Sequence, residues 1–280
     1  MRRLEGRTAI VTGASRGLGV HIARALAAQR VNLVLVARSE DAITKLASEL
    51  SNGGVTAKPL VADLSDIPRL ESVVDRAEAL LGAIDILVNN AGIEGIRVYS
   101  EESDAATEEM LRVNLLSPMV LTRRVLPKML ARKTGHIVNV ASLAGKTSMP
   151  YHASYSTSKA GLVNFTHCVR SELRGTGVSA SVVCPGFVTD EGMFATTSQA
   201  HGLRVSPLLG TSVPQQVARA VVKVLRQDIA ELPVNPGPMR LIQAIQQLTP
   251  GTVAWVQDRV LGVDAMMRKV ALSERESASR

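Results

Sequence analysis

Tyr155 and Lys159 stand four residues apart at the start of a segment, residues 155–173, that has the pattern of a helix. Residues i and i+4 of an α-helix share one face, so the phenol and the ammonium can meet. A free phenol loses its proton near pH ~10, and a neighbouring ammonium favours the phenolate and lowers that pKa. The pair therefore predicts an acid/base tyrosine that works near neutral pH.

Ser142 can complete this site from a different part of the fold. It follows the apolar run 136–141, which is typical of a buried parallel strand. Open α/β sheets bind ligands at the carboxyl ends of their strands, so this hydroxyl can share one substrate oxygen with Tyr155 and Lys159. A tyrosine and a lysine at this spacing also occur by chance on protein surfaces, and the hypothesis therefore depends on the rest of the chain.

A glycine-rich turn near the start of the chain indicates a nucleotide site. It follows the apolar strand 8–11, precedes an amphipathic helical pattern and reads Thr12-Gly13-Ala14-Ser15-Arg16-Gly17-Leu18-Gly19. Glycines let the backbone approach a pyrophosphate closely, and the free amides at a helix start bind its charge. The residues expected to contact a cofactor are Gly13, Ser15, Arg16, Gly17, Leu18 and Gly19. The alternative is a plain turn, because Gly-x-x-x-Gly-x-Gly departs from the commoner Gly-x-Gly-x-x-Gly.

The end of the second strand, residues 32–36, selects between nicotinamide cofactors. An acidic residue at this point holds the ribose 2′-hydroxyl of NAD, whereas an arginine suits a 2′-phosphate. The chain has Arg38 here, with Arg16 available in the glycine turn. These residues predict a preference for NADP(H) over NAD(H). Asp41 is the alternative partner, but residues 39–41 have the pattern of a helix cap with an acidic first turn.

Polar residues also end the next two strands, 55–61 and 84–88, which flank a helix over 67–81. Asp63 follows the first of them and can accept a hydrogen bond from adenine. A compact turn that contains Asn90, Ala91 and Gly92 ends the second, and we expect further cofactor contacts there. The asparagines of this turn can equally tie neighbouring strands together through their amides.

Asn114 lies among apolar neighbours in a helical region, 103–132, that also contains Pro118. Both residues are unfavourable inside a helix, so we expect a kink or an exposed backbone carbonyl there. Such local conflicts often mark a functional site. A later strand, 178–183, leads to Pro185 and Gly186, again at a carboxyl end.

Taken in order, these motifs closely resemble the short-chain dehydrogenase/reductase family over about residues 6–235. The matching set is Thr12-Gly13-x-x-x-Gly17-x-Gly19, Asp63, Asn89-Asn90-Ala91-Gly92, Asn114, Ser142, Tyr155-x-x-x-Lys159 and Pro185-Gly186. The resemblance implies an α/β fold of Rossmann type, with a doubly wound parallel sheet in a single domain. It also implies a nicotinamide cofactor and a catalytic tetrad.

The resemblance also implies a role for each tetrad member. Tyr155 is the general acid/base and Ser142 orients the substrate carbonyl. Lys159 holds the nicotinamide ribose and lowers the tyrosine pKa, while Asn114 anchors a proton-relay water. The expected function is hydride transfer between NADP(H) and a carbonyl or secondary alcohol. The alternative is a non-catalytic NADP(H)-binding sensor or scaffold, which has no need of the acid/base tyrosine.

The chain departs from the family pattern at one position. The family usually has a threonine near the carboxamide, four residues after the glycine of Pro185-Gly186, and this chain has Asp190 there. The backbone of Val188 can supply the carboxamide contact instead. Residues 192–209, which correspond to the substrate lid of the family, are apolar but poor in aromatics, so an aliphatic ketone or acyl group is expected.

We divide the chain into a catalytic domain over 1–235 that includes this lid, a helical extension over 236–272 and a disordered tail over 273–280. The extension carries two apolar stripes at helical spacing, formed by Leu241, Ala244, Ile245 and Leu248 and by Val253, Val256, Val260, Val263, Met267 and Val270. They predict packing against this subunit or a second copy, and we expect a homodimer or homotetramer. Basic residues beside the second stripe leave a membrane-surface helix as the alternative.

Composition narrows the remaining classes. A chain of 280 residues with 46% hydrophobic residues can form one large α/β domain. It has no apolar run of the ~18 residues that a membrane span needs and no signal-peptide pattern, so a cytoplasmic protein is expected. The net charge of +7 favours anionic ligands, but the basic residues do not alternate with aromatics as in nucleic-acid-binding proteins. The five histidines and two cysteines lack metal-ligand spacing, so no metal is expected.

Overall fold

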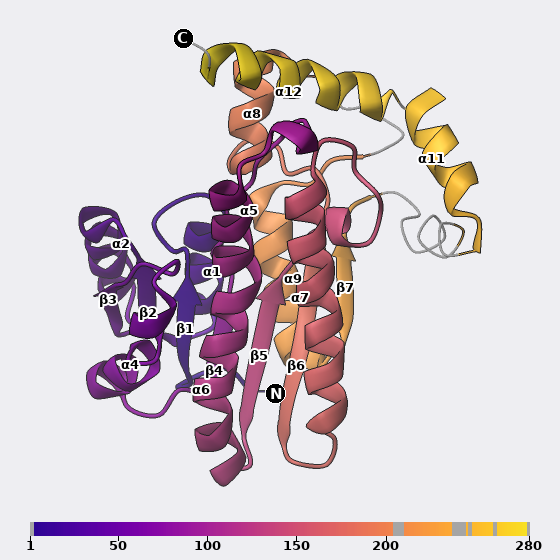
Figure 1. The fold of residues 1–280 in the computed structure, drawn as a ribbon. Helices are drawn as coiled ribbons and strands as arrows, with labels where there is room; N and C mark the ends of the chain where they lie inside the picture. Colours follow the sequence, from indigo (N-terminus) through magenta and orange to yellow (C-terminus); the bar gives the residue numbers. More distant parts are fainter. Residues whose placement is uncertain (1–2, 204–209, 237–244, 246–247, 260–261, 279–280) are drawn as a thin grey trace.

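The computed structural model describes residues 3–203, 210–236, 245, 248–259 and 262–278. This part of the chain forms a parallel sheet of seven strands in the order β3-β2-β1-β4-β5-β6-β7 (Figure 1). The chain moves outward from β1 to β3 and then crosses to β4 on the other side of β1. This reversal creates a topological switch point between β1 and β4, where such sheets bind ligands. The predicted doubly wound parallel sheet is confirmed.

All the strands are short. They are β1 Thr8–Thr12, β2 Asn32–Ala37, β3 Ala57–Val61, β4 Ile86–Asn89, β5 Gly135–Val140, β6 Val178–Pro185 and β7 Glu231–Val234. The sequence analysis did not anticipate β7, because its four half-buried residues are too few to show a period. It contains Pro233, which a parallel sheet tolerates at its edge.

The helices alternate with the strands. They are α1 Leu18–Ala27, α2 Glu40–Asn52, α3 Ile67–Leu70, α4 Val73–Leu81, α5 Asp104–Leu111, α6 Ser117–Ala131, α7 Ala153–Glu172, α8 Met193–His201, α9 Pro214–Gln227, α11 Pro250–Arg259 and α12 Val263–Ala278. The helix expected over 67–81 is thus divided into α3 and α4. The region 103–132 contains a π-helical turn, Arg112–Leu116, between α5 and α6.

Two layers of helices bury both faces of the sheet (Figure 1). Successive residues of β1 point to opposite layers. Ala9 and Val11 pack with α1, α2 and α9, whereas Ile10 packs with α4, α6 and α7. Because both faces are covered, the strands read as continuous apolar runs, and the strand ends are the places where polar side chains can meet a ligand.

The C-terminal extension packs on its own subunit. Helix α12 lies across the carboxyl end of the sheet, next to α8 (Figure 1). Its apolar face forms a cluster, here called the α12 cluster, with the loop after β4; the buried members are Ile96, Val263, Met267, Val270 and Ala271. Of the two packing alternatives, the described residues support contact with the same subunit.

Three details of the extension differ from the sequence analysis. The second stripe is divided between α11 and α12, and Gly262 between them has a left-handed φ of 63°. Helix α12 continues to Ala278, into the segment expected to be disordered, because its glutamate, arginine and alanine residues are good helix formers. Ile245 and Leu248 of the first stripe are exposed. Leu241, Ala244, Val260 and lid residues 204–209 lie outside the described residues.

Candidate active site

A cavity of about 1120 Å³ runs along the carboxyl ends of the strands. Its lining includes residues from the ends of β1, β2, β4, β5 and β6, which are far apart in the sequence. Almost all the predicted site residues line it. The exceptions are Gly19 and Asn114, which lie behind the cavity wall.

The glycine turn lets a ligand approach the backbone closely at one end of this cavity. Gly13 has a φ of 66°, and a Cβ at this position would lie 2.8 Å from the Cα of Ala91. A Cβ on Gly19 would overlap the backbone carbonyl of Gly13, so this glycine allows α1 to pack against the turn. No side chain caps the start of α1. Its first amides therefore remain available to an anion.

Two arginines stand near this end of the cavity. Arg16 and Arg38 line it and are exposed, and the ion pairs found among the described residues include neither of them. Asp41 lies in the first turn of α2, as the sequence pattern indicated. The two guanidinium groups can therefore meet a phosphate without first breaking an ion pair.

Asp63 is held by its own loop. Its Oδ1 accepts hydrogen bonds from the amide of Ser65 at 2.9 Å and from the Ser65 hydroxyl at 2.8 Å. The pKa of Asp63 is lowered, mainly by the backbone hydrogen bond from Ser65, and the charge of Arg38 also contributes. The carboxylate is thus fixed and ionised at the cavity wall, where it can accept a hydrogen bond.

The asparagines at the end of β4 are largely structural, which was the alternative left open by the sequence. Asn89 Nδ2 donates to Asn139 Oδ1 at 2.8 Å and ties β4 to β5. Asn90 Nδ2 donates to the carbonyl of Thr12 at 3.0 Å, and the Asn90 amide donates to the Thr12 hydroxyl at 3.0 Å. These bonds fix the end of β4 against the glycine turn, while Asn90 also lines the cavity.

Asn114 occupies the π-helical turn and is fully buried. Its Nδ2 donates to the carbonyl of Ile93 at 2.8 Å, and the amide of Ile93 donates to its Oδ1 at 2.8 Å. The expected irregularity in this helix is therefore a π-turn, a feature that is frequent at functional sites. Asn114 lies directly behind Gly92, because a Cβ on that glycine would be 3.2 Å from Asn114 Oδ1. Asn114 therefore shapes the cavity by holding the backbone of the loop that follows Gly92.

Ser142, Tyr155 and Lys159 lie together at the middle of the cavity. Ser142 begins a short 3-10 turn, and its hydroxyl accepts a hydrogen bond from the amide of Ala144 at 3.1 Å. A side-chain hydrogen bond also joins Ser142 and Tyr155. Lys159 Nζ donates to the carbonyl of Val140 at 3.2 Å and lies 5.8 Å from the centre of the Tyr155 ring.

The pKa of Tyr155 differs from the expectation. Burial raises it, the charge of Glu94 raises it further, and the hydrogen bond with Ser142 opposes the rise. Burial also lowers the pKa of Lys159 to about 8, which weakens the cation expected to stabilise the phenolate. Desolvation is the largest of these effects, so the phenol is protonated and can act as a proton donor.

The segment after β6 completes the cavity wall. Pro185, Gly186 and Val188 line it. Val188 forms a parallel bridge with Ser212. The hydrogen bonds of this bridge are made by Phe187 and Thr189, the residues on either side of Val188. The amide of Val188 itself therefore points away from Ser212. Asp190, the departure from the family pattern, has a φ of 74° and also lines the cavity.

Sequence reasoning missed several residues of the cavity, of which four matter most for its chemistry and shape. Glu94 and His152 line it beside Tyr155, and their side chains meet at 2.9 Å. Their positions, two residues after Gly92 and three before Tyr155, were the available signal. Val263 and Met267 line the outer end, so α12 covers part of the cavity. No local pattern could indicate that a stripe of the C-terminal helix reaches this site.

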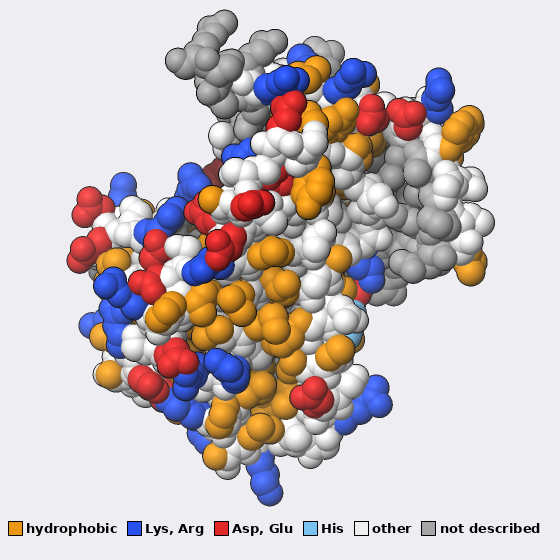
Figure 2. Space-filling model, viewed as in Figure 1, with side chains coloured by type: hydrophobic (Ala, Val, Ile, Leu, Met, Phe, Trp, Pro, Cys, Tyr) orange, Lys and Arg blue, Asp and Glu red, His pale blue; other side chains and the backbone are white. Residues whose placement is uncertain are grey.

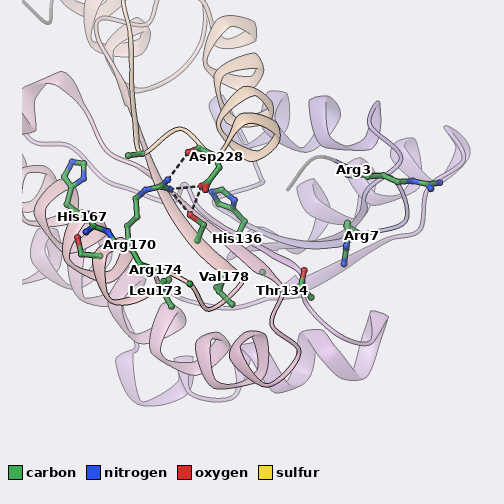
Figure 3. Close-up of a pocket in the computed structure, with 16 residues that line it drawn as sticks. Arg3, Arg7, Thr134, His136, His167, Arg170, Leu173, Arg174, Val178 and Asp228 are labelled. Carbon is green, nitrogen blue, oxygen red and sulfur yellow. Dashed lines mark hydrogen bonds and ion pairs between the residues drawn. The ribbon is translucent and has the colours of Figure 1, made fainter.

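A second hollow, of about 800 Å³, lies at the amino ends of β5 and β6 (Figure 3). Most of its basic side chains already have partners within the fold. Arg170 donates to Asp228 at 2.8 Å, and Arg7 donates to Asp85 at 3.1 Å. Burial lowers the pKa of His136 to about 4, so this ring is neutral. We therefore interpret this hollow as a structural feature.

Comparisons with known proteins agree with this geometry. Residues 7–201 match the family described as short chain dehydrogenase. The chain is 42% identical over 260 residues to the ketoacyl reductase HetN of Nostoc sp. strain PCC 7120. The aligned region covers 90% of this chain and 88% of that protein. Among the described residues, no helix is long and apolar enough to cross a membrane.

Solved structures with bound cofactors are similar as well. An actinorhodin polyketide ketoreductase variant with NADPH superposes with a TM-score of 0.76 and 31% identity, covering 84% of this chain and 98% of that one. A metagenomic short-chain oxidoreductase in complex with NADP gives a TM-score of 0.71 at 31% identity, with the same coverage of 84% and 98%. The chain therefore belongs to the short-chain dehydrogenase/reductase family and is an NAD(P)-dependent oxidoreductase.

Proposed function

We propose that the protein uses NADP(H) to interconvert a ketone and a secondary alcohol on an aliphatic or acyl-type substrate. The observation that carries this proposal is the arrangement of one cavity. Ser142, Tyr155 and Lys159 meet at its middle, and Arg16 and Arg38, which form no ion pair with the described residues, stand at the end next to the glycine turn. The absence of side chains at Gly13 and Gly17 gives a dinucleotide room to approach the backbone.

The residues of the chain divide the chemistry among them. The nicotinamide, when bound, supplies or accepts the hydride. Tyr155 donates the proton to the substrate oxygen in reduction and removes it in oxidation. Ser142 shares a hydrogen bond with Tyr155 and orients the same oxygen. Lys159 holds the ribose and faces the phenol, while Asn114 anchors the loop after Gly92 and a proton-relay water.

The outer end of the cavity supports an apolar substrate. Met149, Phe187, Phe194, Val263 and Met267 line it, so a hydrocarbon chain can be buried there while the ketone meets Tyr155. The names of relatives such as the ketoacyl reductase HetN agree with an acyl substrate. We infer that α12 provides one wall of this acyl site.

We also propose that the protein acts in the cytoplasm as a homodimer or homotetramer. Leu116, Met119 and Leu130 are exposed on and next to α6. Figure 2 shows apolar side chains gathered over this face of the molecule. A second copy of the chain would remove this surface from water.

The experiment that tests the catalytic proposal is Tyr155→Phe, which removes the transferable proton and keeps the ring. Turnover of ketones, followed by NADPH absorbance, should fall by at least ~10²-fold, since general acid catalysis contributes about 10² to 10⁴. NADPH affinity, measured by fluorescence titration, should change little. Tyr99→Phe is the matched control, because Tyr99 is 64% exposed and does not line the cavity.

Two outcomes would contradict the proposal. Retained activity in Tyr155→Phe would remove this residue from the acid/base role. An unmutated protein that binds NADPH but turns over no ketone or secondary alcohol in a broad screen would instead indicate a non-catalytic sensor or scaffold.

A further inference from the structure

The apolar face of α12 meets the cavity over only part of its length. Val263 and Met267, four residues apart on this helix, line the cavity. Val270 is on the same face and is fully buried, but it is not part of the lining. The cavity therefore ends, along α12, between Met267 and Val270, a distance of less than one helical turn.

Met267 helps to close the cavity at this boundary. Its side chain belongs to the lining although none of it is exposed to solvent. Two residues from other segments, Met149 before α7 and Phe187 after β6, also line the cavity and pack against the α12 cluster. Side chains from three segments thus meet where the cavity ends, and Met267 is the contribution of α12.

Polar contacts hold α12 in place on two sides. Lys269 Nζ donates to the carbonyl of His201, the last residue of α8, at 3.0 Å. Arg275 Nη1 and Glu101 Oε1, in the loop after β4, lie 3.1 Å apart. Together with the buried apolar face, these contacts tie α12 to α8 and to the loop after β4 (Figure 1). A wall that is packed and tied in this way sets a fixed limit to the space beside it.

The size of the Met267 side chain determines where this limit lies. Replacement by alanine removes Cγ, Sδ and Cε, about the volume of three methylene groups, and the surroundings of such a site collapse only partly. Each methylene that moves from water into an apolar site contributes about 0.8 kcal/mol, which is about fourfold in affinity. This gain should continue with each added carbon until the chain reaches Met267, and then stop.

We propose that Met267 is a specificity-determining residue that limits the length of the hydrocarbon chain buried beyond the ketone. This inference rests on the proposed function and deepens it, because it assigns selection by chain length to one side chain. The residues that match the family are 7–201, so α12 lies outside them. Selection by length is then a property that the C-terminal extension adds to the family fold.

The test uses the full-length protein with NADPH and a series of unbranched ketones from 2-butanone to 2-undecanone. These compounds share the position of the ketone and differ only in the length of one chain. The readout is kcat/KM for each ketone relative to that for 2-butanone. It is compared between the unmutated enzyme, Met267→Ala and Val263→Ala, a smaller truncation in the same wall.

Met266→Ala is the matched control. Met266 is the neighbouring residue on α12 and packs against the same cluster, but it does not line the cavity. Melting temperature and NADPH affinity report whether each variant folds and binds the cofactor.

We expect relative kcat/KM of the unmutated enzyme to rise about fourfold per methylene up to a limiting length and then to level off or fall. In Met267→Ala the limit should move by about two to three carbons. For a ketone two carbons beyond the original limit, relative kcat/KM should therefore rise about tenfold, mainly through a lower KM. Val263→Ala should move the limit by about one carbon, and Met266→Ala should leave it in place.

Several results would overturn the inference. One is an unchanged limit in a Met267→Ala protein that folds and binds NADPH, and another is an equal shift in Met266→Ala, which would indicate a general loosening of α12. If Met267→Ala failed to fold, Val263→Ala would decide, and an unchanged limit there would refute the inference. In each of these cases, reduction of the shorter ketones would leave the proposed function intact. If the unmutated enzyme reduced no ketone of the series, the proposed function would fail and this inference with it.

Discussion

Removal of Arg38 gives the most direct test of cofactor choice. Arg38 follows β2, lines the cavity beside Arg16 and lacks an ion pair among the described residues. Its charge acts on Asp63, whose pKa it helps to lower. Arg38→Gln keeps the polar character and much of the length of the side chain while it removes the charge. The affinity for a cofactor that carries a 2′-phosphate should therefore fall, and the affinity for a cofactor with a ribose 2′-hydroxyl should not change.

The expected magnitude follows from the exposure of the side chain. A charge-assisted hydrogen bond contributes about 1.5 to 3 kcal/mol, and every 1.4 kcal/mol is tenfold in affinity. Arg38 and Arg16 are both exposed, so water and salt weaken the contact toward the lower end of this range. We expect NADPH affinity to fall about tenfold in either single variant. The double variant should lose less than the product of the two, because both arginines act on one phosphate.

The assay compares dissociation constants for NADPH and NADH by fluorescence titration at ~0.15 M and ~1 M salt. Raising the salt shortens the Debye length from about 8 Å to 3 Å, so the preference of the unmutated protein for NADPH should narrow. Arg69→Gln is the matched control. The side chain of Arg69 is 87% exposed and pairs with Asp66, and this residue does not line the cavity.

Two results would refute this reasoning. The first is equal affinity of the unmutated protein for the two cofactors. The second is a parallel loss of NADH and NADPH affinity in Arg38→Gln, which would mean that the substitution disturbs the end of β2 and not a phosphate contact.

Three further predictions concern stability and pH. Deletion of the residues after Gly251 should lower the melting temperature and expose apolar surface, since each buried aliphatic side chain of α12 contributes about 1.5 to 3 kcal/mol. Glu94→Gln removes a charge that raises the pKa of Tyr155; that pKa should fall, and the pH-dependent rise of alcohol oxidation, which needs the deprotonated phenol, should move to lower pH. Burial lowers the pKa of His136 to about 4 from its ordinary value of 6.5. The unfolded chain therefore takes up a proton between these values while the folded chain does not, and stability should fall by roughly 3 kcal/mol as pH drops through this window. Urea unfolding at pH 7.5 and 4.5 should show a smaller pH dependence in His136→Gln.

Each of these predictions has a contrary outcome. A truncated protein with an unchanged melting temperature and oligomeric state would refute the packing of α12, and loss of binding to anionic vesicles in the same protein would favour the membrane-surface alternative. A pH profile of Glu94→Gln that stays in place or moves to higher pH would contradict the assigned effect of this charge. If His136→Gln lost as much stability between pH 7.5 and 4.5 as the unmutated protein, another group would account for the loss.

The sequence alone predicted six of the seven strands in their order, and all but two of the predicted site residues line the cavity. Strand ends, the glycine turn and the spacing of Tyr155 and Lys159 are local features, and a parallel sheet brings its carboxyl ends to one edge whatever the connecting segments are. The conflict of Asn114 and Pro118 within a helix likewise indicated an irregular turn, and the structure has a π-turn there.

Tertiary structure decided what depends on burial or on contact between distant segments. The pKa of Tyr155 is raised mainly by desolvation in the folded cavity, and the spacing of Tyr155 and Lys159 along a helix does not reveal how deeply the phenol is buried. The pairing of Glu94 with His152 joins residues 58 positions apart. Helix α12 covers the cavity because the extension turns at Gly262 and buries its stripe against the loop after β4. An apolar stripe specifies that a helix face is buried, and only the folded chain specifies against what.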